Sequence, residues 1–297
     1  MPELPEVETM RRGLEAGLRG ATVASVRLVH PDILLDGGAP ERFADGLVGR
    51  RIEGVGRRGK NLLFRLAANG GGRPDEDGSS GGGRAVLQSQ VRMTGRFALA
   101  EAGDPGGRRL RDEIGYTHVA AEFELADGRT LLYDDVRRLG GFRLQSTDDW
   151  ARREARLGSE PLAEGYRAVE LRADLGAGRA PVKNALLDQA RVAGVGNIYA
   201  SEALFRARID PRRACGELTD GDHRRLHRAL RAVLSEALEA EGTSLRDFRA
   251  VNGRSGEFQE RLRVYAREGE PCARCGASIR RIVQAGRGTY FCADCQS

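Results

Sequence analysis

Four cysteines near the end of this 297-residue chain restrict its fold more than any other feature. They form two C-x2-C pairs separated by sixteen residues, at Cys272, Cys275, Cys292 and Cys295. This spacing is typical of two knuckles that close a tetrahedral zinc site, and four thiolate ligands make such a site structural because no position is left open. Disulfide bonds are the alternative, although a reducing compartment disfavours them. We expect one zinc ion per chain.

The segment between the two cysteine pairs, GASIRRIVQAGRGTYF, has two short β-like runs joined by a glycine-containing turn. From residue 271 to the end, four arginines stand against a single acid, Asp294. A small basic zinc ribbon commonly contacts phosphate groups. The formal charge of +5 for the whole chain points weakly in the same direction. We therefore expect a polyanionic partner.

Only two of the 48 basic residues are lysines, Lys60 and Lys183. Where arginine is accepted at almost every basic position, a remaining lysine is expected where a compact ammonium group fits and a planar guanidinium does not. Both lysines lie in apolar segments, RRGKNLLF and APVKNALLDQ. The alternative for each is chance.

Length and local pattern predict an α+β fold of two domains. Residues from about 21 to 145 read as short strands, with a hairpin that turns at Asp127-Gly128, and they predict an N-terminal β-sandwich with flanking helices. Helical patterns dominate the rest of the chain. There Thr219 and Asp222 predict the capped start of a long helix that ends near residue 240.

Targeting and membrane signals are missing from the pattern. No apolar run approaches the roughly 18 residues of a membrane span, and the first residues do not have the pattern of a signal peptide. We therefore expect a cytoplasmic protein with no membrane partner. Residues 69–84 are a glycine-rich, low-complexity hairpin extension to which we assign no function.

The opening Met1-Pro2-Glu3 places a proline amine beside a carboxylate once Met1 is removed. An α-amino group titrates about two to three pH units below a lysine ammonium, so much more of it is the free base at neutral pH. A prolyl amine can form an iminium ion with a sugar aldehyde, and Glu3 can move protons for ring opening. The alternative is a plain helix start, because prolines suit a first turn and the next apolar residues follow helical spacing. Both interpretations hold together if a buried helix presents its N-terminus to a cleft.

The segment Gly194-Val195-Gly196-Asn197 joins two helical patterns. Glycines at such a corner let backbone N–H groups approach an anion, and the start of the following helix adds a favourable dipole. The Asn197 amide is a further donor. The segment therefore suits a DNA phosphate, with an ordinary helix-turn-helix corner as the alternative.

Four segments in this order resemble the formamidopyrimidine-DNA glycosylase family of bacterial base-excision repair enzymes: MPELPEVET, VAGVGNIYASEALF, FQERLRVYAREGEPC and the four-cysteine finger. The resemblance covers nearly the whole chain. It implies a β-sandwich catalytic domain over residues 2–148, a helical helix-two-turn-helix domain that binds DNA over 149–258, and a zinc ribbon over 259–297. It also implies a monomeric DNA glycosylase and AP lyase that excises oxidised purines, 8-oxoguanine and formamidopyrimidines, from damaged double-stranded DNA. Such an enzyme is bacterial and nucleoid-associated when bound to DNA.

The same resemblance implies a role for individual residues, and zinc takes no part in the chemistry. Pro2 is the nucleophile at the sugar C1′ and forms a Schiff base that leads to β,δ-elimination. Glu3 is its acid/base partner. The phosphate contacts around the lesion are Lys60 and Arg287. The further DNA contacts are Lys183 near the lesion, Asn197 on the lesion-side backbone, Tyr265 before the finger, and Met93, Arg138 and Leu139, which fill the hole that a flipped base leaves.

The wedge residue Leu139 departs from the family pattern, which usually has Phe there. Leucine still serves as an apolar wedge, but the stacking of a ring is lost. The alternative is that Leu139 packs in the sandwich core. Gln90 stands before the wedge loop, where the family commonly has His. The loop 250–258 matches the region that covers the flipped base, and its glycines fit a mobile lid.

Two other functions are open at this point. An endonuclease VIII-type enzyme shares the scaffold and the nucleophile but prefers oxidised pyrimidines, and Leu4 together with the wedge region favours the purine enzyme. A non-catalytic zinc-ribbon protein that binds DNA would explain the charge and the finger. It would leave Pro2 and Glu3 unexplained.

Overall fold

A computed structural model describes residues 2–68, 83–104, 107–244, 251 and 256–297. The chain divides into two compact units. Unit 1 comprises residues 1–2, 6–154 and 244–256, and unit 2 comprises 3–5, 155–243 and 257–297. The zinc-ribbon segment therefore groups with the helical part of the chain. Most of the glycine-rich stretch 69–84 and most of the loop 250–258 lie outside the described residues.

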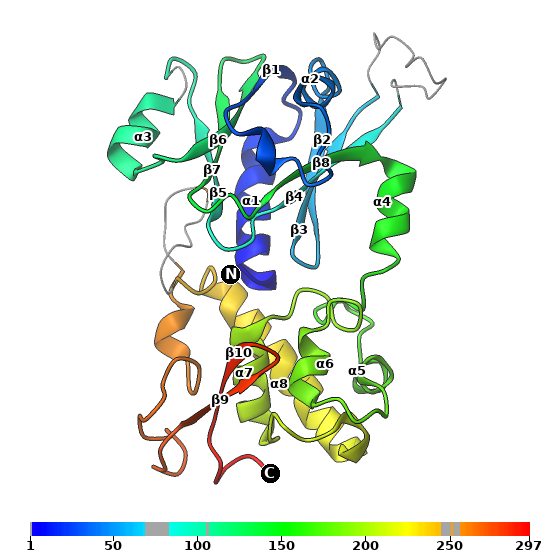
Figure 1. The fold of residues 1–297 in the computed structure, drawn as a ribbon, viewed down its shortest axis with the longest axis vertical. Helices are drawn as coiled ribbons and strands as arrows, with labels where there is room; N and C mark the ends of the chain where they lie inside the picture. The colour runs from blue at the N-terminus through cyan, green and yellow to red at the C-terminus, as the bar shows by residue number, and fades with distance from the viewer. Residues whose placement is uncertain (1, 69–82, 105–106, 245–250, 252–255) are drawn as a thin grey trace. The chain divides into compact units, whose positions relative to one another are not determined.

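Unit 1 contains two four-stranded antiparallel sheets, which confirms the expected sandwich (Figure 1). One sheet has the strand order β1-β6-β7-β5, and its strands are Val23–Leu28, Val119–Leu125, Thr130–Asp135 and Gly95–Ala100. The other has the order β2-β3-β4-β8, with strands Ile52–Arg58, Asn61–Leu66, Ala85–Gln90 and Gly141–Ser146. The predicted hairpin at Asp127-Gly128 joins β6 to β7.

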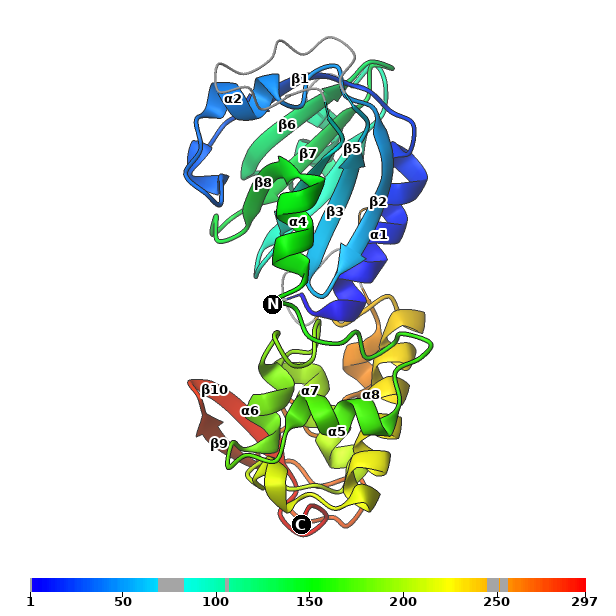
Figure 2. The same cartoon turned by 90° about the vertical axis from the view of Figure 1, so that its right-hand side faces the viewer.

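One apolar core lies between the two sheets of unit 1 and includes helix α1, Leu4–Leu18. Figure 2 shows this helix beside the sheets. Its inward face follows helical spacing, because Val7, Met10, Leu14 and Leu18 are each at most 1% exposed. Two short helices were not expected between the strands, α2 (Pro40–Asp45) and α3 (Arg108–Ile114). Helix α4 (Thr147–Glu154) lies where the helical patterns begin in the sequence.

Unit 2 is helical, and its core is formed mainly by α7 (Asn197–Ala207) and α8 (Asp220–Glu239). Thr219 caps α8 as predicted, since its hydroxyl accepts a hydrogen bond from the Asp222 N–H at 3.1 Å. Two shorter helices pack against this pair, α5 (Ala168–Leu175) and α6 (Val182–Leu187). Short 3₁₀ turns lie at Pro31–Ile33 in unit 1 and at Cys215–Glu217 and Phe258–Arg261 in unit 2.

The ribbon of unit 2 is an antiparallel hairpin of β9 (Arg280–Gln284) and β10 (Arg287–Phe291), as the sequence predicted. Its two turn residues, Ala285 and Gly286, have φ of 47° and 72°. Two successive positive φ values are characteristic of the type I′ turn, whose twist matches the flanking strands. Arg287 is the first residue after this turn and is exposed. Among the described helices, none is both long enough and apolar enough to cross a membrane.

Candidate functional site

Glu3 lies at the start of helix α7 in unit 2 and is 2% exposed. Its carboxylate accepts hydrogen bonds from the backbone N–H groups of Ile198 at 2.9 Å and Tyr199 at 3.4 Å. The first N–H groups of a helix have no partner within the helix, and the helix dipole favours a negative charge there. The structure therefore gives Glu3 a fixed position and a favourable electrostatic environment.

The glycines before α7 leave room for the N-terminal segment. A Cβ atom on Gly196 would lie 2.3 Å from the Glu3 carboxyl carbon, and one on Gly194, whose φ is +89°, would lie 2.8 Å from the Leu4 side chain. Leu4 also donates its backbone N–H to the Gly194 carbonyl at 3.0 Å. The Ile198 and Tyr199 N–H groups at this corner thus bind the carboxylate of Glu3, and a phosphate contact of Asn197 stays a prediction.

Lys183 on α6 is fully buried in the tight position that its sequence context predicted. Its ammonium donates to the Thr289 hydroxyl at 2.6 Å and to the Gly288 carbonyl at 3.2 Å, and both acceptors belong to β10. Burial lowers the pKa of Lys183 to about 8; the positive charge of Arg287 acts in the same direction, and the negative charge of Glu3 opposes it. The Lys183 side chain is thus held in a buried site against strand β10 of the ribbon.

Asn197 also contacts the ribbon. Its amide nitrogen donates to the Gly288 carbonyl at 2.9 Å, so this one carbonyl oxygen accepts from both Asn197 and Lys183. The Asn197 carbonyl oxygen is buried and has no hydrogen-bond partner among the described residues. Tyr265 packs its ring edge-on against Tyr290 of β10, with ring centroids 5.1 Å apart. The structure therefore gathers Glu3, Lys183, Asn197, Tyr265 and Arg287 in unit 2.

Sequence reasoning missed two residues that support this cluster, Thr289 and Glu202. Thr289 is fully buried and is the closer of the two acceptors of Lys183. Glu202 on α7 is also fully buried and accepts the backbone N–H groups of three consecutive residues at 2.9 to 3.0 Å: Arg263, Val264 and Tyr265. Burial raises the pKa of Glu202. An acid in the otherwise apolar stretch IYASEALF was a signal that could have identified it.

The other predicted site residues lie in unit 1. Lys60 is in the two-residue turn between β2 and β3. Met93 follows β4, and Arg138 and Leu139 follow β7. Met93 is 40% exposed and Leu139 is 54% exposed, so the alternative in which Leu139 packs in the sandwich core is wrong.

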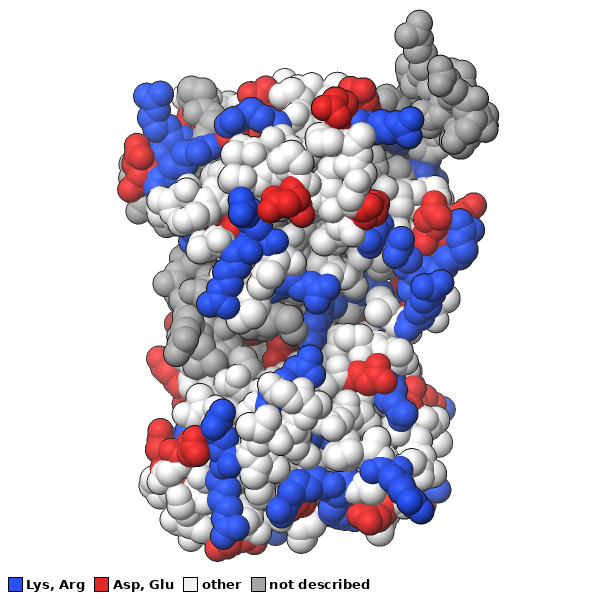
Figure 3. Space-filling view, viewed as in Figure 1, with Lys and Arg blue, Asp and Glu red and all other residues white. Residues whose placement is uncertain are grey.

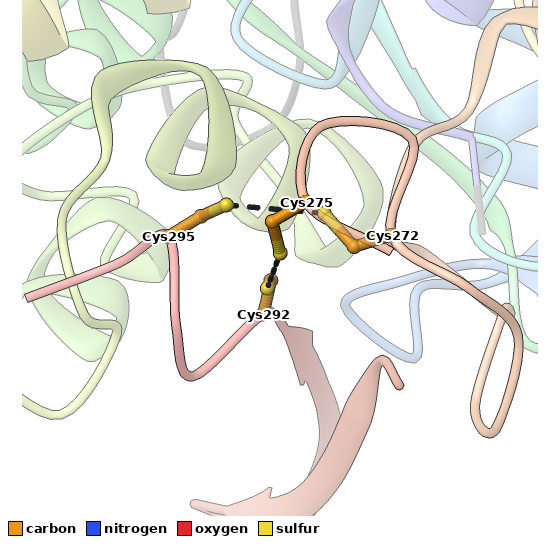
Figure 4. A group of neighbouring side chains, drawn as sticks. All are labelled: Cys272, Cys275, Cys292 and Cys295. Carbon is orange, nitrogen blue, oxygen red and sulfur yellow. Dashed lines mark hydrogen bonds between the residues drawn. The ribbon is translucent and has the colours of Figure 1, made fainter. Parts of the chain in front are cut away.

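The four finger cysteines meet at one point (Figure 4). The Sγ atoms of Cys272 and Cys295 are 4.0 Å apart, those of Cys275 and Cys292 are 3.5 Å apart, and all four lie within 4.8 Å of one another. A zinc ion about 2.3 Å from four tetrahedral sulfurs spaces them about 3.8 Å apart, whereas a disulfide needs about 2.05 Å. The residues therefore fit one structural zinc ion and do not form disulfides.

Basic side chains are interspersed with acidic ones on the face of the molecule shown in Figure 3, so charge alone does not outline a single binding patch. The fold and the site together define a protein with a β-sandwich, a helical unit, a four-cysteine ribbon and buried ionisable groups beside it. Family models match residues 1–142 (Formamidopyrimidine-DNA glycosylase N-terminal domain), 157–249 (its H2TH domain) and 269–297 (Zinc finger found in FPG and IleRS). The chain belongs to the formamidopyrimidine-DNA glycosylase family.

Individual relatives agree along the full length. A formamidopyrimidine-DNA glycosylase of Heliobacterium modesticaldum is 43% identical over all of both chains. Two structures of the Lactococcus lactis enzyme, in complexes with DNA containing N7-benzyl-Fapy-dG and with DNA containing an oxidised pyrimidine, are each 35% identical and cover 99% of both chains, with TM-scores of 0.83 and 0.82. This chain is thus a DNA glycosylase of base excision repair with AP lyase activity, and the non-catalytic alternative does not hold.

Proposed function

We propose that this enzyme excises oxidised purines, 8-oxoguanine and formamidopyrimidines, through a Schiff base on Pro2. The prolyl nitrogen attacks the sugar C1′, the bond from C1′ to the base breaks, and the ring oxygen leaves C1′ as the iminium forms. Successive β- and δ-eliminations then release the 3′ and 5′ phosphates of the abasic sugar. The observation that carries the proposal is the buried Glu3 carboxylate, fixed at the start of α7 directly after Pro2 in the chain.

Glu3 suits the proton transfers of this reaction. A carboxyl group that is held by two backbone N–H groups keeps one geometry, which general acid–base catalysis requires. The buried charge of Lys183 lies close enough to Glu3 for the two to influence each other electrostatically. We assign Glu3 to the protonation of the ring oxygen during ring opening. We assign Lys183 to a contact with the DNA near the lesion.

The proposed DNA contacts divide between the two units. Unit 2 offers Arg287, which is exposed directly after the ribbon turn. It also offers Asn197 and Tyr265, which contact Gly288 and Tyr290 of the same ribbon. Unit 1 offers Lys60 in a hairpin turn and the exposed wedge side chains Met93, Arg138 and Leu139. Arginine and lysine contacts to phosphates position the enzyme, and apolar side chains inserted into the stack replace the flipped base. The proposed domains are the β-sandwich catalytic domain over 2–148, the helix-two-turn-helix domain over 149–258 and the zinc ribbon over 259–297.

Borohydride trapping on a duplex with 8-oxoguanine opposite cytosine tests the nucleophile. We expect a covalent protein–DNA adduct and an intact mass that begins at Pro2, because an acylated proline nitrogen is not nucleophilic. Pro2→Gly should keep some trapping through its primary amine. Active enzyme that retains Met1 would overturn the assignment. A second duplex with an oxidised pyrimidine tests the endonuclease VIII-type alternative. This lesion is included because the Lactococcus lactis enzyme has been solved in complex with DNA that contains an oxidised pyrimidine.

Leu139→Ala should lower excision from the lesion duplex by about tenfold, since an inserted apolar side chain stabilises the unstacked state. Leu139→Phe should preserve or raise it. Val136→Ala is the matched control, because Val136 lies in the same loop and is equally exposed at 53%. An abasic single strand should respond less, since part of the unstacking cost is absent there. Equal losses on both substrates would show that Leu139 is not a wedge.

A further inference from the structure

Asp135 ends strand β7 in unit 1 and is 1% exposed. Its carboxylate accepts four hydrogen bonds. One oxygen accepts from the Thr94 hydroxyl at 2.5 Å and the Arg137 N–H at 3.3 Å, and the other accepts from the Gly140 N–H at 2.9 Å and the Tyr133 hydroxyl at 3.2 Å. Burial raises the pKa of Tyr133, and the charge of Asp135 adds to this, so Tyr133 remains a neutral donor.

Three of these donors come from two different loops, and the fourth, Tyr133, belongs to β7. Thr94 follows Met93 in the loop between β4 and β5, while the Arg137 and Gly140 N–H groups bracket Arg138 and Leu139 in the loop between β7 and β8. The loops are also linked directly, because the Arg137 N–H donates to the Thr94 hydroxyl at 3.2 Å. One buried carboxylate thus ties together the backbones that carry all three proposed wedge side chains.

The backbone around this carboxylate is closely packed. A Cβ atom on Gly140 would lie 2.2 Å from the Tyr133 hydroxyl and 2.4 Å from the Gln90 carbonyl oxygen. Arg92 and Arg138, one in each loop, have φ of 48° and 50°. Residues other than glycine rarely adopt this left-handed backbone conformation, and the surrounding structure has to hold them in it. The Arg138 N–H is held by the Asp135 carbonyl at 3.1 Å.

We infer that Asp135 is a positioning residue that holds the two loops as one unit, so that Met93, Arg138 and Leu139 enter the DNA together. This inference rests on the proposed wedge role of those three residues. A carboxylate suits the position because it only accepts hydrogen bonds, and all four groups around it donate. An amide of the same shape would replace one of these oxygens with an NH₂ group, which cannot accept the two hydrogen bonds that this oxygen accepts.

Asp135→Asn tests the inference, with Asp134→Asn as the matched control. Asp134 precedes Asp135 in β7 and is also buried, but it binds Arg96 and the His118 N–H instead of the wedge loops. We expect Asp135→Asn to speed amide hydrogen exchange at least tenfold at Arg137 and Gly140 and to lower excision from the lesion duplex at least tenfold. Cleavage of an abasic single strand should change less than twofold. Asp134→Asn should affect both substrates alike.

The readouts separate this inference from the proposed function. Unchanged exchange at Arg137 and Gly140 in Asp135→Asn would overturn the role of Asp135. Faster exchange with normal excision from the lesion duplex would support that role and overturn the wedge function instead. Tyr133→Phe removes one of the four donors and keeps the ring, so it provides the same comparison if Asp135→Asn does not fold. The expected result for Tyr133→Phe is a smaller change in the same direction.

Discussion

Glu3→Gln is expected to lower base excision by about 10²- to 10⁴-fold, the usual contribution of general acid–base catalysis. Glutamine keeps the shape of the side chain and an oxygen that can accept the Ile198 N–H, but it cannot donate a proton to the sugar ring oxygen. Lesion DNA should still bind within a few-fold of the wild-type affinity. Single-turnover excision and equilibrium binding on the same lesion duplex measure the two effects.

Glu8→Gln is the control for this substitution. Glu8 lies on helix α1, which begins directly after Glu3 in the chain, and is paired with Arg11, Arg12 and Arg57 in unit 1. Glu8→Gln should leave excision unchanged.

Losing the charge at the helix start should also cost Glu3→Gln about 0.3–1 kcal/mol of stability. If Glu3→Gln instead weakened DNA binding as much as excision, its role would be structural and the acid/base assignment would fail.

Cys292→Ser is expected to remove the zinc ion and unfold the ribbon, because the binding free energy of a structural zinc, about 10–16 kcal/mol in small fingers, is also the folding free energy of the segment. The β9–β10 hairpin carries Arg287 and both acceptors of Lys183, so its loss removes these contacts together. Specific DNA binding should fall toward the non-specific level, on the order of 10³-fold. Metal analysis and binding at a fixed salt concentration measure the outcome.

Cys215→Ala separates loss of zinc from general loss of a cysteine. Cys215 is buried in the helical core of unit 2 and is not one of the clustered cysteines. This variant should retain one zinc per chain and normal affinity for DNA. The sandwich of unit 1 should remain folded in both variants. Normal affinity of Cys292→Ser without bound metal would contradict the assigned role of the finger.

Local patterns predicted most of the architecture. The capping residues of α8 and the turn at Asp127-Gly128 act within a few positions, so they identified their elements from sequence alone. The short helices α2 and α3 were missed because each is at most seven residues long, which is too short for a helical period to stand out among strands.

Exposure could not be predicted in the same way. An apolar residue such as Leu139 fits a sandwich core and a loop surface equally well by composition, and only the path of the chain placed it outside. Asp135 likewise reads as one of two acids at a strand end. Its four donors lie as many as 41 positions away from it along the sequence, and folding alone brings them to one carboxylate.

The sequence by itself determined the zinc ligands, the proline amine next to a carboxylate, and the two unusual lysines, because residue type and short spacing are sufficient to specify such chemistry. The partners of these groups were decided only by the tertiary structure. The glycine corner before α7 predicted an anion but could not identify it, since a helix start binds any suitably placed negative charge. The fold places there the carboxylate of Glu3, which lies 195 positions away along the chain from Ile198.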